Sequence, residues 1–193
     1  MRIFQHAVGA ALVVLSTTAT VRAREPGIKY DCDTAANNFS ELVLPAPAGP
    51  FVVTGKVRLQ KIVQSKDYIP LTRIWITEPE PDPAKNAERW AGFSISAISA
   101  KALGLEKKVA KPVLQFLGWD EGRDGKAVPH EPIGPLDDAE SLAFSLSYDG
   151  AAVVTSIAGR EFNASSAIRN PVVRIICSTG EFLYTDLRIE KAG

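Results

Sequence analysis

The chain has 193 residues, with 22 basic and 22 acidic side chains, and 46% of its residues are apolar. This composition can bury one sizeable core, and the length fits a single domain. The near-neutral charge argues against nucleic acid and anionic membranes as partners, because both attract clustered positive charge. We therefore expect neither of them to bind the mature protein.

Residues 1–23 are expected to be a signal peptide. Arg2 and His6 precede the apolar stretch AVGAALVVLSTTATV, and residues 21–23 offer small side chains at the two positions that signal peptidase reads. The alternative is an uncleaved anchor, but the stretch is short and Thr-rich for a bilayer span of about 20 residues. The mature domain, residues 24–193, would then be secreted or periplasmic.

Two cysteines, Cys32 and Cys177, lie in the mature domain. In an oxidising compartment, two cysteines in one domain most simply form a disulfide with each other. Two buried free thiols are the alternative. The mature domain has a single histidine, His130, which leaves too few ligands for a zinc site, and we expect no cofactor.

Alternation of apolar and polar residues predicts strands along most of the mature domain. In chain order they are expected near Cys32 and at residues 40–45, 51–63, 71–78, 91–99 and 111–119. A helical turn or two is expected at most, within residues 98–110. Segments rich in glycine, proline and acidic residues separate these strands at 46–50, 78–86 and 120–138.

Two hairpins are predicted toward the C-terminus. The alternating run 141–148 is followed by Asp149-Gly150 and then by AAVVTSIAG, and an Asp-Gly pair between two such runs is typical of a tight hairpin turn. The runs PVVRIIC and EFLYTDLRIE are expected to form a second hairpin around a turn at residues 178–180, with Cys177 at its mouth.

Eight or nine short strands at this spacing, with hardly any helix, predict an all-β fold. The expected architecture is a two-sheet antiparallel sandwich of the jelly-roll type, in which the N-terminal and C-terminal segments are adjacent. A first strand beside the terminal hairpin would bring Cys32 within reach of Cys177. The second cysteine is therefore interpreted as structural and not as a nucleophile.

The order of the elements resembles the concanavalin A-like lectin and glucanase superfamily of jelly-roll sandwiches. The matching segments, which belong to a resemblance over most of residues 28–190, are PFVVTGKVRL, WAGFSIS, FSLSYDGAAVVTSIAG and VVRIICSTGEFLYTDLRIE. The resemblance implies that the last strand returns beside the first in one sheet. It does not imply glucanase activity, because the Glu-x-Asp-x-x-Glu run that supplies the paired carboxylates for glycoside hydrolysis is absent.

One string resembles a calcium loop. In DEGRDGKAVPHE, Asp120, Asp124 and Glu131 stand at positions 1, 5 and 12 of the EF-hand spacing. Position 3 is Gly122, which supplies no ligand, and no predicted helix flanks the string. A solvated turn is the favoured interpretation, and calcium is the alternative.

Three tryptophans could stack on sugar rings. Trp75 and Trp90 stand in strand-like surroundings, which favours packing in the core. Trp119 ends a strand beside acidic residues and is therefore the predicted ligand-binding residue. No catalytic residue is predicted, because no G-x-S-x-G motif is present and His130 lies in a loop between prolines.

These observations favour a non-catalytic binding domain of an exported protein, with a glycan or another exported protein as its partner. Two alternatives stay open: a structural or interaction domain without a small ligand, and a hydrolase with dispersed carboxylates. An exposed aromatic strip on a sheet would favour the first, a flat apolar patch the second, and two facing carboxylates about 5–9 Å apart the third.

Overall fold

The computed structural model describes residues 26–63, 65–79, 89–105, 107–108, 113–122, 131–133, 140–165 and 167–193. The expected signal peptide lies outside these ranges, so its cleavage stays a prediction. The described residues are arranged in strands and turns, and none of them belongs to a helix of the length and apolarity that a bilayer crossing requires.

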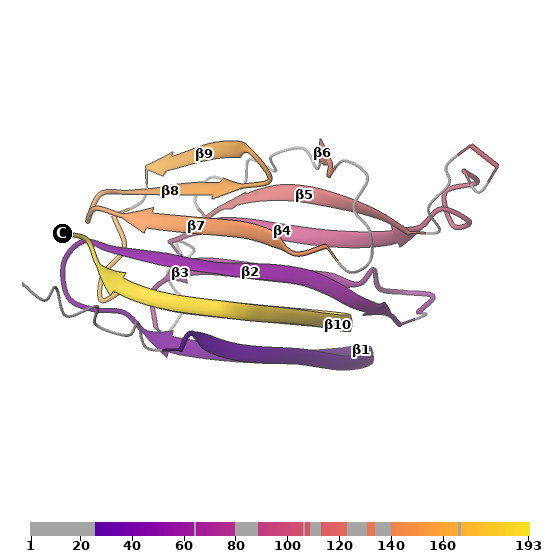
Figure 1. The fold of residues 1–193 in the computed structure, drawn as a ribbon, viewed down its shortest axis with the longest axis horizontal. Coiled ribbons are helices and arrows are strands. Elements are labelled where there is room, and N and C mark those ends of the chain that lie inside the picture. Colours follow the sequence, from indigo (N-terminus) through magenta and orange to yellow (C-terminus); the bar gives the residue numbers. More distant parts are fainter. Residues whose placement is uncertain are drawn as a thin grey trace, which may run out of the picture.

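The described part of the chain forms ten strands, all paired in antiparallel fashion (Figure 1). They are β1 (Ile28–Pro45), β2 (Phe51–Ile62), β3 (Leu71–Thr77), β4 (Trp90–Ser99), β5 (Val113–Glu121), β6 (Glu131–Pro132), β7 (Leu142–Tyr148), β8 (Ala152–Ile157), β9 (Arg160–Ser165) and β10 (Val172–Lys191). The strands predicted at 51–63, 71–78, 91–99, 111–119 and 141–148 are confirmed to within two residues at each end. The hairpin predicted at Asp149-Gly150 is confirmed by the pairing of β7 with β8.

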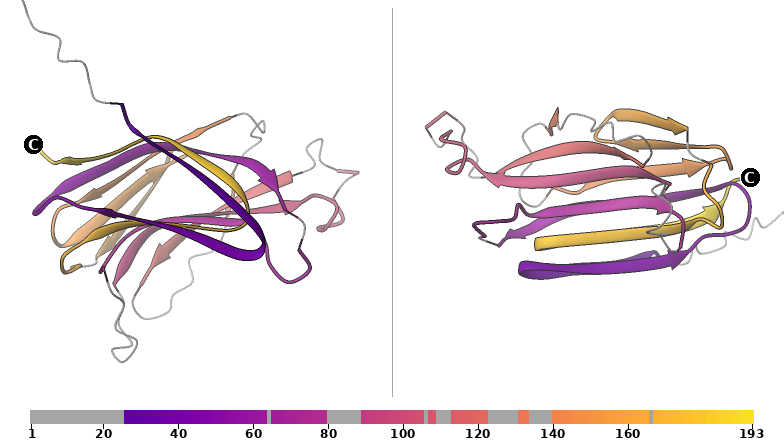
Figure 2. Two further views of the ribbon diagram at one scale, coloured as in Figure 1. Left: turned by 90° about the horizontal axis from the view of Figure 1, so that it is seen from below. Right: turned by 180° about the vertical axis from the view of Figure 1, so that it is seen from behind.

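Two layers of strands face each other. The first layer has the order β6-β5-β4-β3, followed by residues 172–178 of β10 and residues 39–45 of β1. The second layer has the order β9-β8-β7-β2, followed by residues 180–191 of β10 and residues 28–34 of β1. Figure 2 shows β1 and β10 bending from one layer into the other. The predicted antiparallel sandwich with adjacent chain ends is therefore confirmed.

The hairpin predicted between PVVRIIC and EFLYTDLRIE is wrong, because both runs belong to the single strand β10. The first half of β10 pairs with β3 and the second half with β2, and β1 pairs with both halves. Thr179, with a φ of 54°, lies at the bend between the layers. Each half thus has a neighbour on both edges, so its backbone donors and acceptors are satisfied without the two halves pairing with each other.

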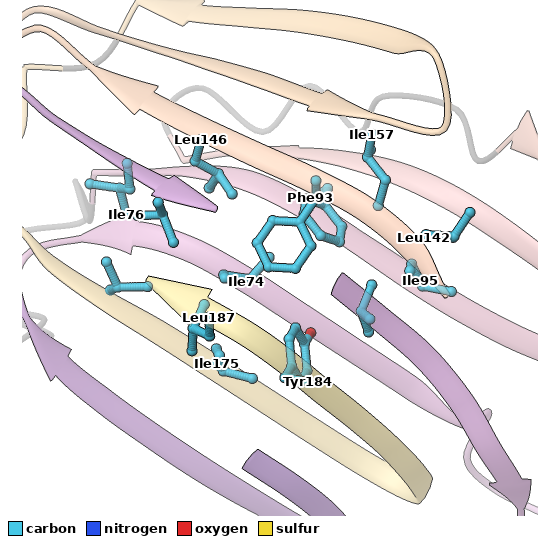
Figure 3. Close-up of a cluster of buried hydrophobic side chains, with 14 of the residues drawn as sticks. Ile74, Ile76, Phe93, Ile95, Leu142, Leu146, Ile157, Ile175, Tyr184 and Leu187 are labelled. Atoms are coloured by element: carbon cyan, nitrogen blue, oxygen red, sulfur yellow. The ribbon is translucent and has the colours of Figure 1, made fainter. Parts of the chain in front are cut away.

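The core lies between the layers, where the inward faces of the strands meet (Figure 3). Phe93 of β4 meets Phe144 of β7 with 5.3 Å between ring centroids, and Phe144 also meets Tyr184 of β10 at 6.1 Å. Tyr184 is fully buried and its hydroxyl lies 2.7 Å from the hydroxyl of Thr72; burial raises the pKa of Tyr184. Each large apolar side chain buried here contributes about 1.5–3 kcal/mol, which holds the layers together.

The disulfide predicted between Cys32 and Cys177 is confirmed, with 6.1 Å between the Cα atoms. Both cysteines are fully buried. Cys32 lies in the part of β1 that belongs to the second layer, and Cys177 lies in the part of β10 that belongs to the first. The bridge therefore joins the two layers through the core, and the alternative of two free thiols is excluded.

Candidate functional site

Trp119, the predicted ligand-binding residue, is a core residue. Only 9% of its surface is exposed, and its ring stacks on that of Phe162 of β9 with 5.5 Å between centroids. In the register of β4 and β5, Trp119 lies opposite the fully buried Phe93, so both side chains point between the layers. The expectation that Trp119 is exposed at a strand end is corrected by this placement.

The other two tryptophans, which were expected in the core, lie on the outer face of the first layer. Trp75 and Trp90 are both half-buried, and their rings lie 5.6 Å apart with 30° between the planes. In β3, Ile74 and Ile76 are fully buried, so Arg73 and Trp75 point the opposite way. The alternation in LTRIWIT places Trp75 on the face opposite Ile74 and Ile76, and a strand-like setting alone does not show which face is buried.

Glycines on the neighbouring strands make room for the two indoles. Gly92 lies between Trp75 and Asp120 in the register, and Trp75 reaches across it so that Nε1 donates to the Asp120 carboxylate at 3.0 Å. Gly122 lies against the ring of Trp90, because a Cβ at this glycine would overlap carbons Cδ2, Cε3 and Cε2 of the indole. Both rings are therefore held in place before any ligand arrives.

Two arginines flank Trp75. The guanidinium carbon of Arg73 lies over the Trp75 ring, 5.2 Å from its centroid, which is a favourable cation–π distance. Arg174 lies opposite Trp75 on β10, where it forms an ion pair of 3.1 Å with Glu41 and donates to the carbonyl of Pro79 at 3.1 Å. We call this surface the tryptophan face and define it by Arg73, Trp75, Trp90, Asp120 and Arg174.

The outer face of the second layer has a different character, since its described residues include exposed ion pairs and no tryptophan. Lys56 binds Asp186 at 2.9 Å and Lys61 binds Glu181 at 2.6 Å. The hydrogen bond from Lys56 lowers the pKa of Asp186, and the hydrogen bond to Glu181 raises the pKa of Lys61. Such paired, solvated charges are typical of an ordinary protein surface. The tryptophan face therefore stands out as the candidate binding surface.

The residues of the possible calcium loop have other partners. Asp120 accepts the indole N–H of Trp75 at 3.0 Å, and Glu131 forms an ion pair of 2.9 Å with Arg160. Asp124 lies outside the described residues. Within the described ranges, no three side chains of the types His, Cys, Asp and Glu are grouped so that they could hold a metal ion.

A hollow of about 640 Å³ opens at one end of the sandwich. It lies between the β1–β2 loop, the β7–β8 turn and the segment that precedes β10. Two of its polar side chains stabilise the turns around it: the Tyr148 hydroxyl donates to the carbonyl of Ile168 at 2.8 Å, and the Asp149 carboxylate accepts two backbone N–H groups. The side chains of Tyr148 and Asp149 are thus already engaged in hydrogen bonds within the fold.

No family model matches the chain, and no curated protein matches it significantly. A carbohydrate-binding module from Bacillus subtilis matches with 11% identity and a TM-score of 0.45, over 83% of this chain and 86% of the other. A Bacillus subtilis protein of unknown function with a galectin-like fold matches with 10% identity and a TM-score of 0.49, over 83% and 80% of the two chains. A legume lectin-like domain from Entamoeba histolytica matches with 14% identity and a TM-score of 0.44, over 84% and 82%.

The strand order and pairings of the described residues make the chain an antiparallel β-sandwich. The TM-scores stay below 0.5 and the identities below 15%, so the likeness concerns the fold and carries no inference about a ligand. Support for a function comes from the side chains of the tryptophan face.

Proposed function

We propose that this protein is a non-catalytic glycan-binding domain of an exported protein, and that the tryptophan face binds the sugar. The observation that carries the proposal is the pair of adjacent indoles, Trp75 and Trp90, with the Arg73 guanidinium over the Trp75 ring and the Asp120 carboxylate at its N–H edge. A pyranose has a face of C–H bonds that packs against the electron-rich face of an indole. Its hydroxyl groups can accept hydrogen bonds from guanidinium groups and donate them to carboxylates.

The fixed positions of the side chains support this proposal. Asp120 anchors the nitrogen end of Trp75, and Gly122 seats the ring of Trp90. Immobilising a flexible side chain on binding costs about 0.5–1.5 kcal/mol, and side chains that are already held avoid much of that cost. A sugar, whose individual contacts are weak, gains much from such a preformed surface.

The carboxylates of this face are too far apart for the alternative function, a glycoside hydrolase. Glu41 and Asp120 lie on β1 and β5, which are separated by β10, β3 and β4. Four strand spacings of about 4.8 Å put them about 19 Å apart, whereas glycosidase pairs stand about 5–9.5 Å apart. Among the described residues, this face therefore supports binding and not hydrolysis.

A second candidate function, an interaction domain without a small ligand, is favoured by strand β1. Within the described residues β1 pairs with β10 alone, so its other edge is open. Ile28, Phe39 and Val43 on this strand are large apolar side chains that are 44%, 74% and 44% exposed. Open edges of this kind can accept a strand from another protein.

The test is a glycan array probed with residues 24–193, followed by calorimetric titration of the sugars that bind. We expect Trp75→Ala to weaken binding at least tenfold, which corresponds to about 1.4 kcal/mol of lost contact. Tyr68→Ala is the matched control, because Tyr68 is an aromatic side chain that is 57% exposed on the β2–β3 loop. An array without any bound glycan, or an unchanged affinity in Trp75→Ala, would contradict the proposal and leave the interaction domain ahead.

A further inference from the structure

A cluster of hydrogen-bond donors without acceptors lies beside Trp75. Arg73 and Ser94 face each other across β3 and β4, and Arg174 lies opposite Trp75 on β10. The Nε atoms of both arginines and the hydroxyl oxygen of Ser94 are buried and have no hydrogen-bond partner within the described part of the chain. Ser94 itself is only 1% exposed. Buried polar groups without partners cost free energy, so such a cluster calls for an explanation.

The carboxylates of the same face are already engaged. Glu41 binds Arg174 at 3.1 Å, and Asp120, two strands away from β3, accepts the indole N–H of Trp75 at 3.0 Å. Among the described residues, the Arg73 guanidinium contacts the Trp75 ring and no carboxylate. Arg73 is thus a cation on the tryptophan face, and no carboxylate among the described residues pairs with it.

We propose that the tryptophan face binds an acidic glycan, with the carboxylate of a uronic acid residue held by Arg73. This inference rests on the proposed function and narrows its ligand to carboxylated sugars. The planar guanidinium presents paired N–H groups that match the two oxygens of a carboxylate, which a lysine could not do. The bond between the ligand carboxylate and Arg73 supplies a counter-ion that the described residues do not provide for this side chain.

The arrangement of Arg73 and Trp75 fits one sugar residue. The guanidinium and the indole are neighbours along β3 and already in contact. In a uronic acid the carboxylate is attached directly to the pyranose ring, so a carboxylate on Arg73 leaves the ring beside the indole. One uronate residue can therefore form an ion pair with Arg73 and pack against Trp75 at the same time. A neutral sugar can pack against Trp75 but cannot form the ion pair.

The test compares galacturonate, glucuronate and mannuronate oligosaccharides with their carboxyl-reduced forms, in which each carboxylate has become a neutral CH₂OH group. We expect at least one acidic oligosaccharide to bind at least tenfold more tightly than its reduced form, and we expect salt to diminish the difference. Arg73→Gln should abolish this preference, so that the acidic oligosaccharide and its reduced form bind this variant with equal affinity. Arg73→Lys should restore only part of it, because it keeps the charge but not the paired donors.

Arg58→Gln is the matched control. Arg58 also carries a buried Nε without a partner, but it lies on β2 in the second layer. The Arg58→Gln variant should retain the preference for the acidic oligosaccharide over its reduced form. Circular dichroism of each variant checks that the β fold is intact before affinities are compared.

The two proposals fail in different ways. Equal affinity for every acidic oligosaccharide and its reduced form, with Trp75→Ala weakening both, would overturn the acidic ligand and leave glycan binding intact. A preference that persists in Arg73→Gln would also overturn the role of Arg73. The absence of binding to any sugar, reduced or acidic, would contradict the proposed function and this inference together.

Discussion

Removing the disulfide between Cys32 and Cys177 should lower the stability of the domain without changing its fold. The two cysteines are 145 residues apart in sequence, so the bridge closes residues 32–177 into one loop. In the chain-entropy model a loop of this length loses enough freedom in the unfolded state to stabilise the native state by about 5 kcal/mol. Domains of this size are usually stable by about 5–15 kcal/mol, so the effect should be large.

The perturbation is the pair of single variants Cys32→Ala and Cys177→Ala, together with the double variant. Both side chains are fully buried, and alanine removes one sulfur atom from each site without introducing a polar group. We expect a loss of about 3–5 kcal/mol in each single variant, measured by urea unfolding followed by circular dichroism. The double variant should lose about as much as either single variant, because one bridge is broken in each case.

Reduced wild-type protein provides the control. It should unfold at a urea concentration close to that of the double variant, since both lack the same cross-link. The reasoning would be refuted by a loss below about 1 kcal/mol in the single variants. A double variant whose loss equals the sum of the two single losses would also refute it, because the cysteines would then act separately.

The other predictions concern a turn and a glycine. The N–H groups of Ala151 and Ala152 lower the pKa of the Asp149 carboxyl from its ordinary 3.8. Because this pKa is lower in the folded state, the stabilisation is complete above the ordinary value and is lost as the pH falls through the folded value. Asp149→Asn should therefore have a lower urea midpoint than the wild type at about pH 7 and a similar one at about pH 2; a difference that persists in acid would contradict the assignment. Gly92→Ala should cost about 1–3 kcal/mol in thermal unfolding, because its Cβ would overlap the carbonyl oxygen of Ile74, and a loss below about 0.5 kcal/mol would show that the strands can move apart.

Local patterns predicted the local elements well. The alternating run before Asp149-Gly150 and the apolar run after it gave the β7–β8 hairpin, because a tight turn and its two strands are determined by residues close in sequence. The pairing of Cys32 with Cys177 was also predictable, since two cysteines in one oxidised domain leave a single intramolecular partner. The adjacency of the chain ends was predicted from the sandwich fold, and it brings the two cysteines within reach of each other.

The course of β10 was not predictable from local patterns. Ser178, Thr179 and Gly180 suit a hairpin turn, and they suit a bend between layers equally well. The choice depends on the partners of each half, and those partners, β3 and β2, lie about a hundred residues earlier in the chain. Only the assembled sandwich decides whether the chain turns back in one layer or crosses to the other.

The sequence by itself determined which side chains share a face of a strand, and the tertiary structure decided which face points outward. In β3 the alternation places Arg73 with Trp75 and Ile74 with Ile76, whatever the partner strands are. That the first pair faces outward, and that Trp119 faces inward, depends on the register with neighbouring strands and on the packing of the opposite layer. The tryptophan face exists because β10, β3, β4 and β5 lie side by side in that register, and alternation along one strand contains no information about its neighbours.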